Sequence, residues 1–66
     1  MMAVLPRLRE NRTNQALSQR ELATRANVTQ TTIVMAEAAG NFRPSTHRKL
    51  AEALGVHPRE LLGDRA

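Results

Sequence analysis

Gln30 and Thr31 are the residues of this chain whose chemistry best suits recognition of another molecule. A glutamine amide donates and accepts hydrogen bonds in the bidentate pattern that fits N6 and N7 of adenine. A threonine offers a hydroxyl and a methyl group. Val34 and Met35 extend the same helical face by one turn, because residues four apart lie on one side of a helix. Two exposed apolar side chains suit thymine methyl groups, so all four residues are candidate contacts to DNA bases.

Each of these four candidates also has a purely structural interpretation. The two polar residues would lie in solvent or support the start of a helix. Val34 and Met35 would pack in the core, which is the usual place for a methionine at a helix interface. Ile33 and Ala36 already occupy the core side of the same segment, so we favour contact with a ligand for the apolar pair as well.

The charge of the chain points to a polyanionic partner. Ten Lys and Arg residues against six Asp and Glu give a net charge of +4. A small basic domain is attracted to nucleic acid, although a membrane surface or an acidic protein would attract it too. Phe42 is the single aromatic residue, which argues against single-strand binding on stacked rings and against an aromatic RNA-binding sheet. Double-stranded DNA is therefore the favoured polymer.

Enzyme chemistry finds little support in these 66 residues, which we expect to form one small domain, 1–66. No nucleophile lies at useful spacing from a base, and no Gly-rich phosphate loop is present. Two histidines, His47 and His57, are too few for a zinc site, so we expect no metal and no cofactor. No apolar run is long enough for a membrane span, and the absence of cysteine suits the reducing cytoplasm, where we expect the protein.

The composition is typical of an all-α protein, because Ala, Leu, Arg and Glu dominate and no alternating strand pattern occurs. Ser18 to Glu21 forms a capping box, which predicts a helix start. Thr29 is the expected N-cap of the next helix, and Asn27 and Gly55 are suited to the left-handed backbone that ends a helix. We expect five short helices, at about Val4–Asn14, Gln19–Ala26 and Gln30–Ala38, then from a cap at Ser45 or Thr46 to Leu54, and from Pro58 to near Gly63.

Two of these segments, Gln19–Ala26 and Gln30–Ala38, have the spacing of a helix-turn-helix. In that motif the first helix crosses the DNA backbone, and the second lies in the major groove with its N-terminal residues against the bases. The small Ala23 lets the two helices approach, and Val28 supplies an apolar anchor beside the turn. Many helical hairpins do not bind DNA, so the pattern alone leaves other uses open.

Four blocks of this sequence resemble the Cro/phage-repressor family of helix-turn-helix proteins, often called XRE. The resemblance extends over about residues 5–62, with the blocks in the family's order. It implies a lambda-repressor-like bundle of five helices, with the helix-turn-helix at about residues 18–38, and a homodimer that binds a DNA operator. The blocks are Leu17–Ala23, Ala26–Ile33, Glu37 with Arg43–Ser45, and Leu50–Val56.

Four positions depart from the family's usual residues, and one of them is His57, where the family often has Ser or Asp before the proline. Ala16 and Asn27 stand where the family commonly has glycine. Asparagine accepts a left-handed backbone, whereas alanine does so less well, so we expect a slightly different exit from the first helix. Ala36 stands where the family usually has Ile or Leu, so the core there should be thinner or filled by a neighbour.

The resemblance also implies roles for residues outside the four base-contact candidates. Gln19 and Arg43 correspond to positions that contact DNA phosphates, and solvent exposure is the alternative for both. Thr32 either reaches a phosphate or only covers the start of its helix. Arg12 and Glu37 lie on the apolar sides of their helices and correspond to a structural ion pair between the first and third helices.

Together these expectations describe a small transcriptional regulator that binds double-stranded DNA sequence-specifically as a homodimer. Leu61, Leu62 and Val56 would close the core or face the second copy. The alternative is an antitoxin or adaptor that uses the same fold to bind a protein partner, with Val34 and Met35 as the docking patch. A membrane-active peptide is disfavoured by the internal helix caps and the absence of tryptophan.

Overall fold

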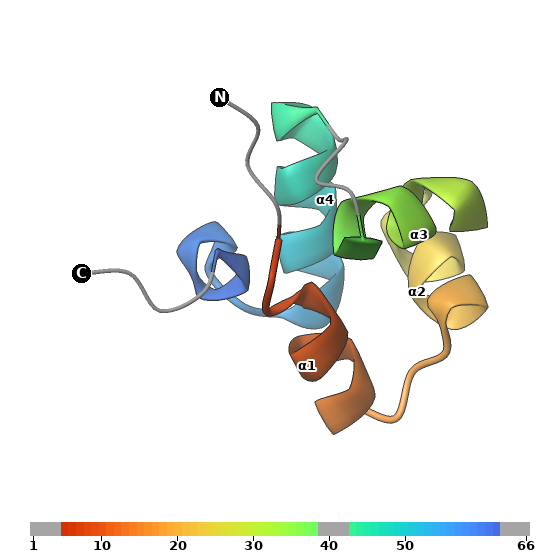
Figure 1. Ribbon diagram of the computed structural model, residues 1–66, viewed down its shortest axis with the longest axis horizontal. Helices are drawn as coiled ribbons and strands as arrows, with labels where there is room; N and C mark the ends of the chain where they lie inside the picture. Colours follow the sequence, from red (N-terminus) through yellow and green to blue (C-terminus); the bar gives the residue numbers. More distant parts are fainter. Residues whose placement is uncertain (1–4, 39–42, 63–66) are drawn as a thin grey trace.

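Four α-helices and one short 3-10 helix form the regular structure of residues 5–38 and 43–62, the parts of the chain that the computed structural model describes (Figure 1). No strand occurs among these residues, so the expected all-α bundle is confirmed, with a 3-10 turn as its fifth helix. The elements are α1 (Leu8–Asn14), α2 (Gln19–Ala26), α3 (Gln30–Ala38), α4 (Pro44–Leu54) and η1 (Pro58–Leu61).

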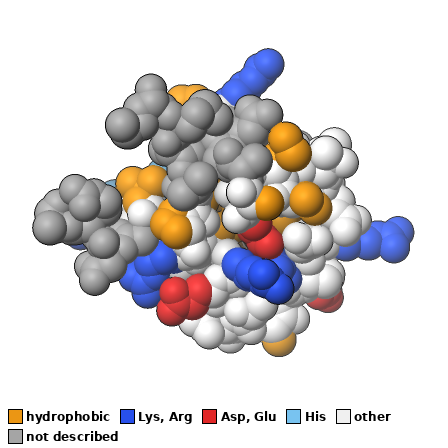
Figure 2. Space-filling model, in the orientation of Figure 1, with side chains coloured by type: hydrophobic (Ala, Val, Ile, Leu, Met, Phe, Trp, Pro, Cys, Tyr) orange, Lys and Arg blue, Asp and Glu red, His pale blue; other side chains and the backbone are white. Residues whose placement is uncertain are grey.

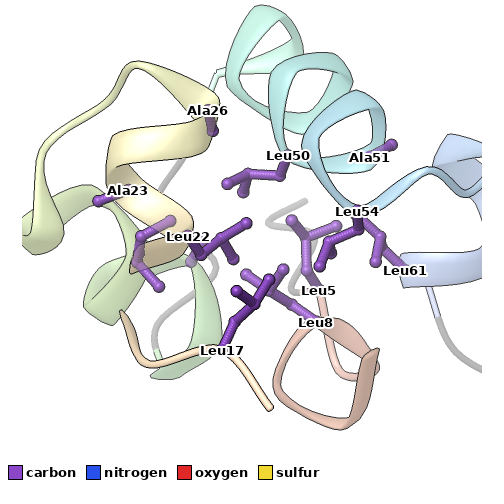
Figure 3. Packing of buried hydrophobic residues seen from close by; sticks show 12 residues of the cluster. Leu5, Leu8, Leu17, Leu22, Ala23, Ala26, Leu50, Ala51, Leu54 and Leu61 are labelled. Atoms are coloured by element: carbon purple, nitrogen blue, oxygen red, sulfur yellow. The ribbon is translucent and has the colours of Figure 1, made fainter. Parts of the chain in front are cut away.

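Leucine side chains from α1, α2, α4 and η1 converge at the centre of the bundle (Figure 3). α3 joins this core through Ile33 and Ala36, which have no solvent exposure. Ala23 of α2 is only 4% exposed, and its small side chain lets α2 and α3 approach closely. Full burial of each large side chain stabilises the fold by about 1.5–3 kcal/mol. The largest fully buried side chains are Leu5, Leu8, Leu22, Ile33, Leu50 and Leu61.

Both helices of the helix-turn-helix begin where the sequence predicts. The Ser18 Oγ accepts from the Glu21 amide at 3.0 Å, and the Ser18 amide donates to the Glu21 carboxylate at 2.8 Å. The hydrogen bond from the Ser18 backbone, followed by that from its side chain, lowers the pKa of Glu21. At α3 the Thr29 Oγ1 accepts from the Thr32 amide at 3.2 Å. These caps fix the chain direction at the start of each helix.

Three helices end in the same left-handed turn. The turn residues are Ala16 after α1, Asn27 after α2 and Gly55 after α4, with φ of 58°, 59° and 72°. In each, the next amide donates back to a carbonyl in the last helical turn, at 3.1, 2.9 and 3.0 Å, which is a Schellman motif. The exit of α1 differs slightly, as expected: its C-cap is Gln15, with φ of −99°, and the left-handed residue follows one position later. Ala16 holds a backbone that costs an L-residue about 1–2 kcal/mol.

The start of α1 differs from the prediction. The helix begins at Leu8, because Pro6 lies inside a turn closed by a 3.0 Å hydrogen bond from the Leu8 amide to the Leu5 carbonyl. The Arg7 amide donates to the Leu61 carbonyl of η1 at 3.1 Å. This contact with a distant segment holds residues 5–7 out of the helix, and no local sequence pattern predicts it.

The start of α4 also differs from the prediction. The N-cap is Arg43, with no side-chain capping bond, and Pro44 is the first helical residue. Neither Ser45 nor Thr46 caps the helix, because proline is preformed for the first helical position and drives the preceding residue into extended backbone. At the other end of the chain η1 ends at Leu61. The expected end near Gly63 lies outside the described residues.

Candidate nucleic-acid interface

The outer face of α3, formed by Gln30, Thr31 and Val34, points away from the core. All three residues are exposed, and Val34 is exposed to 40%. Ile33 and Ala36 turn to the opposite side and are fully buried. The helix therefore meets the core along one side only, and the N-terminal half of its other side is open to a ligand.

Met35 and Thr32 occupy the edges of this helix. Met35 is half-buried, so it lies nearer the bundle than Val34 does. Thr32 is also half-buried, and its hydroxyl lies 2.9 Å from the hydroxyl of Thr29. That contact makes Thr32 part of the cap of α3, and its hydroxyl remains at the margin of the outer face.

A buried ion pair joins α3 to α1. The Arg12 Nε donates to the Glu37 Oε2 at 2.7 Å, and the Arg12 Nη2 donates to the Glu37 Oε1 at 3.4 Å. The Arg12 Nη1 also donates to the Leu17 carbonyl at 2.8 Å. The two charged side chains are 10% and 7% exposed. Charged side chains buried this deeply need a complete set of hydrogen-bond partners. Arg12 and Glu37 are partners of each other, and the Leu17 carbonyl is a further partner of Arg12.

Gln19, the first residue of α2, is tied into this pair. Its Nε2 donates to the Glu37 Oε1 at 3.2 Å. No local sequence pattern predicts this bond, because Gln19 and Glu37 are 18 positions apart and belong to different helices. An amide group carries two N–H donors, so one bond to Glu37 leaves the second hydrogen for another acceptor. Glu37 thus orients the side chain at the N-terminus of α2.

A hollow of about 450 Å³ brings this cluster together with the outer face of α3. Arg9, Ser18, Gln19 and Val34 line it, along with the ion pair and Ala38. The hollow therefore places a basic side chain and the start of α2 beside the middle of α3. Sequence reasoning missed Arg9, although its position three residues before Arg12 puts both arginines on one side of α1.

Arg43 is exposed at the N-terminal end of α4, and its side chain makes no capping hydrogen bond. Asn41 and Phe42, which precede it, lie outside the described residues. His47 of α4 lies against η1, where its Nε2 is 2.7 Å from the Pro58 carbonyl. His47 thus joins α4 to η1.

Positive charge is spread over the surface rather than gathered on α3. Figure 2 shows Lys and Arg side chains scattered over one face and projecting from its edge, with acidic side chains among them. One exposed arginine, Arg7, is paired with Glu10 at 3.2 Å. Basic side chains therefore surround the bundle on several sides. The other exposed basic residues in the described part are Arg9, Arg20, Arg25, Arg43, Arg48, Lys49 and Arg59.

Among residues 5–38 and 43–62 no three His, Asp or Glu side chains come close enough together to hold a metal ion. None of the helices in the same ranges has the length and apolar character needed to cross a membrane.

The sequence profile of a helix-turn-helix family matches residues 8–61, which is most of the chain. The chain belongs to this family, the XRE type of helix-turn-helix proteins. The match includes α1 to η1 and the outer face of α3. Among curated proteins nothing matches this helix-turn-helix protein.

Solved structures resemble this helix-turn-helix protein closely. The restriction-modification controller protein C.AhdI from Aeromonas hydrophila is 38% identical, with a TM-score of 0.80 over 85% of this chain and 86% of that chain. A hypothetical transcription factor, NHTF, from Neisseria is 36% identical, with a TM-score of 0.77 over 83% and 63%. The N-terminal DNA-binding domain of SinR from Bacillus subtilis, at 24% identity, shares the fold, with a TM-score of 0.79 over 89% and 88%. Family and neighbours support DNA-binding transcription regulation as the class of function.

Proposed function

We propose that this protein is a small transcriptional regulator that binds double-stranded DNA sequence-specifically, with α3 in the major groove. The observation that carries the proposal is the outer face of α3. Gln30 and Thr31 are exposed in its first turn, Val34 follows on the same side, and the opposite side is buried in the core. A helix presented in this way fits the groove with its N-terminal residues toward the bases, and Met35 meets the same bases from the edge of the helix.

The phosphate contacts in this proposal come from the elements that flank α3. Gln19 lies at the N-terminus of α2, where free amides and the helix dipole favour an anion. Its side-chain amide donates one N–H to Glu37, and the second N–H is available to a phosphate. Thr32 offers its hydroxyl at the margin of the outer face, and Arg43 offers an exposed guanidinium before α4. Contacts of this kind fix the position of the protein on the duplex without choosing the sequence.

We further propose that the regulator acts as a homodimer, on DNA in the cytoplasm. Leu61 is fully buried and closes the core, whereas Leu62 beside it is 38% exposed. Val56 is partly buried against the core. Leu62 is thus the apolar residue of this region left for a second copy. In such a dimer the two α3 helices would lie about 34 Å apart, one turn of B-DNA.

Selection of bound sites from a random duplex library, followed by affinity measurements at several salt concentrations, tests the proposal. We expect one preferred site, with log affinity falling by about 0.9 per phosphate contact for each unit of log salt. Gln30→Ala should change the preferred bases. The matched variant Arg43→Ala should weaken all sites alike and reduce the salt slope by about 1. Absence of any retention at low salt would refute the proposal and favour a protein-binding adaptor that docks through the exposed Val34.

A further inference from the structure

The outer face of α3 carries no charged side chain. From Gln30 to Ala38 the only ionisable residue is Glu37. Its carboxylate is turned inward, 7% exposed, and held by Arg12 and Gln19. The first turn of α3 contains no acid and its last turn contains no base. A ligand on this face therefore meets amide, hydroxyl and methyl groups only.

The amide, hydroxyl and methyl groups of the outer face favour A·T over G·C base pairs. Guanine is most often recognised by an arginine or lysine that donates to its O6 and N7, and cytosine by a carboxylate that accepts from its N4. The outer face offers neither group. The Gln30 amide matches the N6 and N7 of adenine, and the Val34 methyl groups match the C5-methyl of thymine. Thr31 can bond to any base through its hydroxyl, so it does not alter this preference.

We infer that the base pairs beneath α3 in the preferred site are A·T pairs, with a thymine methyl against Val34; this rests on the proposed function. From Gln30 to Val34 the helix rises about 6 Å, which corresponds to about two base pairs. The A·T core of each half-site therefore has about this length. Val34 is the specificity-determining residue for thymine, and Gln30 is the one for adenine.

The same observation separates specificity from electrostatic attraction. Since the outer face of α3 supplies no cation, neutralisation of phosphates falls to residues on other elements, such as Arg9 and Arg43. Changes in the core base pairs should therefore alter affinity and leave the slope of log affinity against log salt unchanged. An arginine on the recognition face would couple the two quantities.

Replacement of thymine by uracil in the selected duplex tests this inference, because uracil lacks only the C5-methyl. We expect one core thymine whose replacement weakens wild-type binding about fourfold, the effect of about one buried methyl group. The same replacement outside the core should have no effect. In Val34→Ala the fourfold penalty should disappear, whereas in Thr24→Ala, a change on the exposed side of α2, it should persist.

Val34 is exposed, so its substitution leaves the fold intact, which circular dichroism checks directly. The inference is overturned if the selected core requires G·C pairs, or if Val34→Ala retains the uracil penalty. Either result would leave sequence-specific DNA binding in place. Failure of the protein to retain any duplex at low salt would overturn the proposed function, and this inference with it.

Discussion

The two sides of α3 differ in almost every property that a helix surface can have. The inner face, formed by Ile33, Ala36 and the carboxylate of Glu37, is buried and bound to two other helices. The outer face is exposed and uncharged. The two sides of this nine-residue helix therefore have different roles. Residues of the inner face determine stability and position, and residues of the outer face are free to determine specificity.

The largest expected effect is on the inner face, at the buried ion pair. Arg12→Ala should destabilise the fold by about 3–5 kcal/mol, because it leaves the Glu37 carboxylate buried without its charge partner. Arg9→Ala removes the same charge from the surface and should change stability by at most about 0.5 kcal/mol. Thermal unfolding followed by circular dichroism compares the two. Equal effects would show that the pair does not hold α3 in place.

A neighbouring pair of residues gives the next contrast. Ile33→Ala should destabilise the fold by about 2–5 kcal/mol, because it opens a cavity in a site with no solvent exposure. Val34→Ala, one position later, should cost at most about 0.5 kcal/mol. Denaturant titration measures both variants. Similar losses at both positions would mean that Val34 packs inside the protein, and the division between the two faces would fail.

A smaller effect is expected at the cap of α2, which supports Gln19. Ser18→Ala should cost about 1 kcal/mol and raise the pKa of Glu21 part of the way toward its ordinary value of 4.5, because it removes the side-chain bond that lowers this pKa and keeps the backbone bond. A lowered native pKa stabilises the fold above the ordinary value, and this contribution is lost as the pH falls through the native pKa. NMR titration of the Glu21 side chain should therefore show a higher pKa in the variant. An unchanged pKa would contradict the capping assignment.

The smallest effect is expected at the left-handed turn that follows α1. Ala16→Gly relieves a left-handed alanine but gives the unfolded chain more freedom, so the net stabilisation should be about 0.5–1 kcal/mol. Because Ala16 is not part of the outer face of α3, the preferred DNA site should not change. Thermal unfolding and site selection measure the two quantities. A changed preferred site would mean that residues outside the outer face of α3 also determine specificity.

Local signals predicted both helices of the motif. Ser18, Thr29 and Asn27 act through neighbours within a few residues, so the starts of α2 and α3 and the end of α2 follow from sequence. The separation of Ile33 from Val34 follows from helical periodicity in the same way.

The features that the sequence did not reveal depend on distant partners or on competition between caps. Residues before Leu8 leave α1 because Arg7 bonds to Leu61, which is far along the chain. Gln19 bonds to Glu37 across two helices. At α4, Pro44 takes the first helical position and Arg43 becomes the N-cap, so the hydroxyl of Ser45 does not cap the helix. The positions of hydroxyl residues alone do not predict this start.

Amide chemical-shift mapping with the selected duplex tests the central claim most directly, because it reports which side of the bundle meets DNA. The outer-face account predicts that the largest shifts lie at residues 30–35 and at the first turn of α2, with small shifts in η1 and in α4 beyond its first turn. The contrary result would be large shifts along α4 and η1 while Gln30, Thr31 and Val34 remain unchanged.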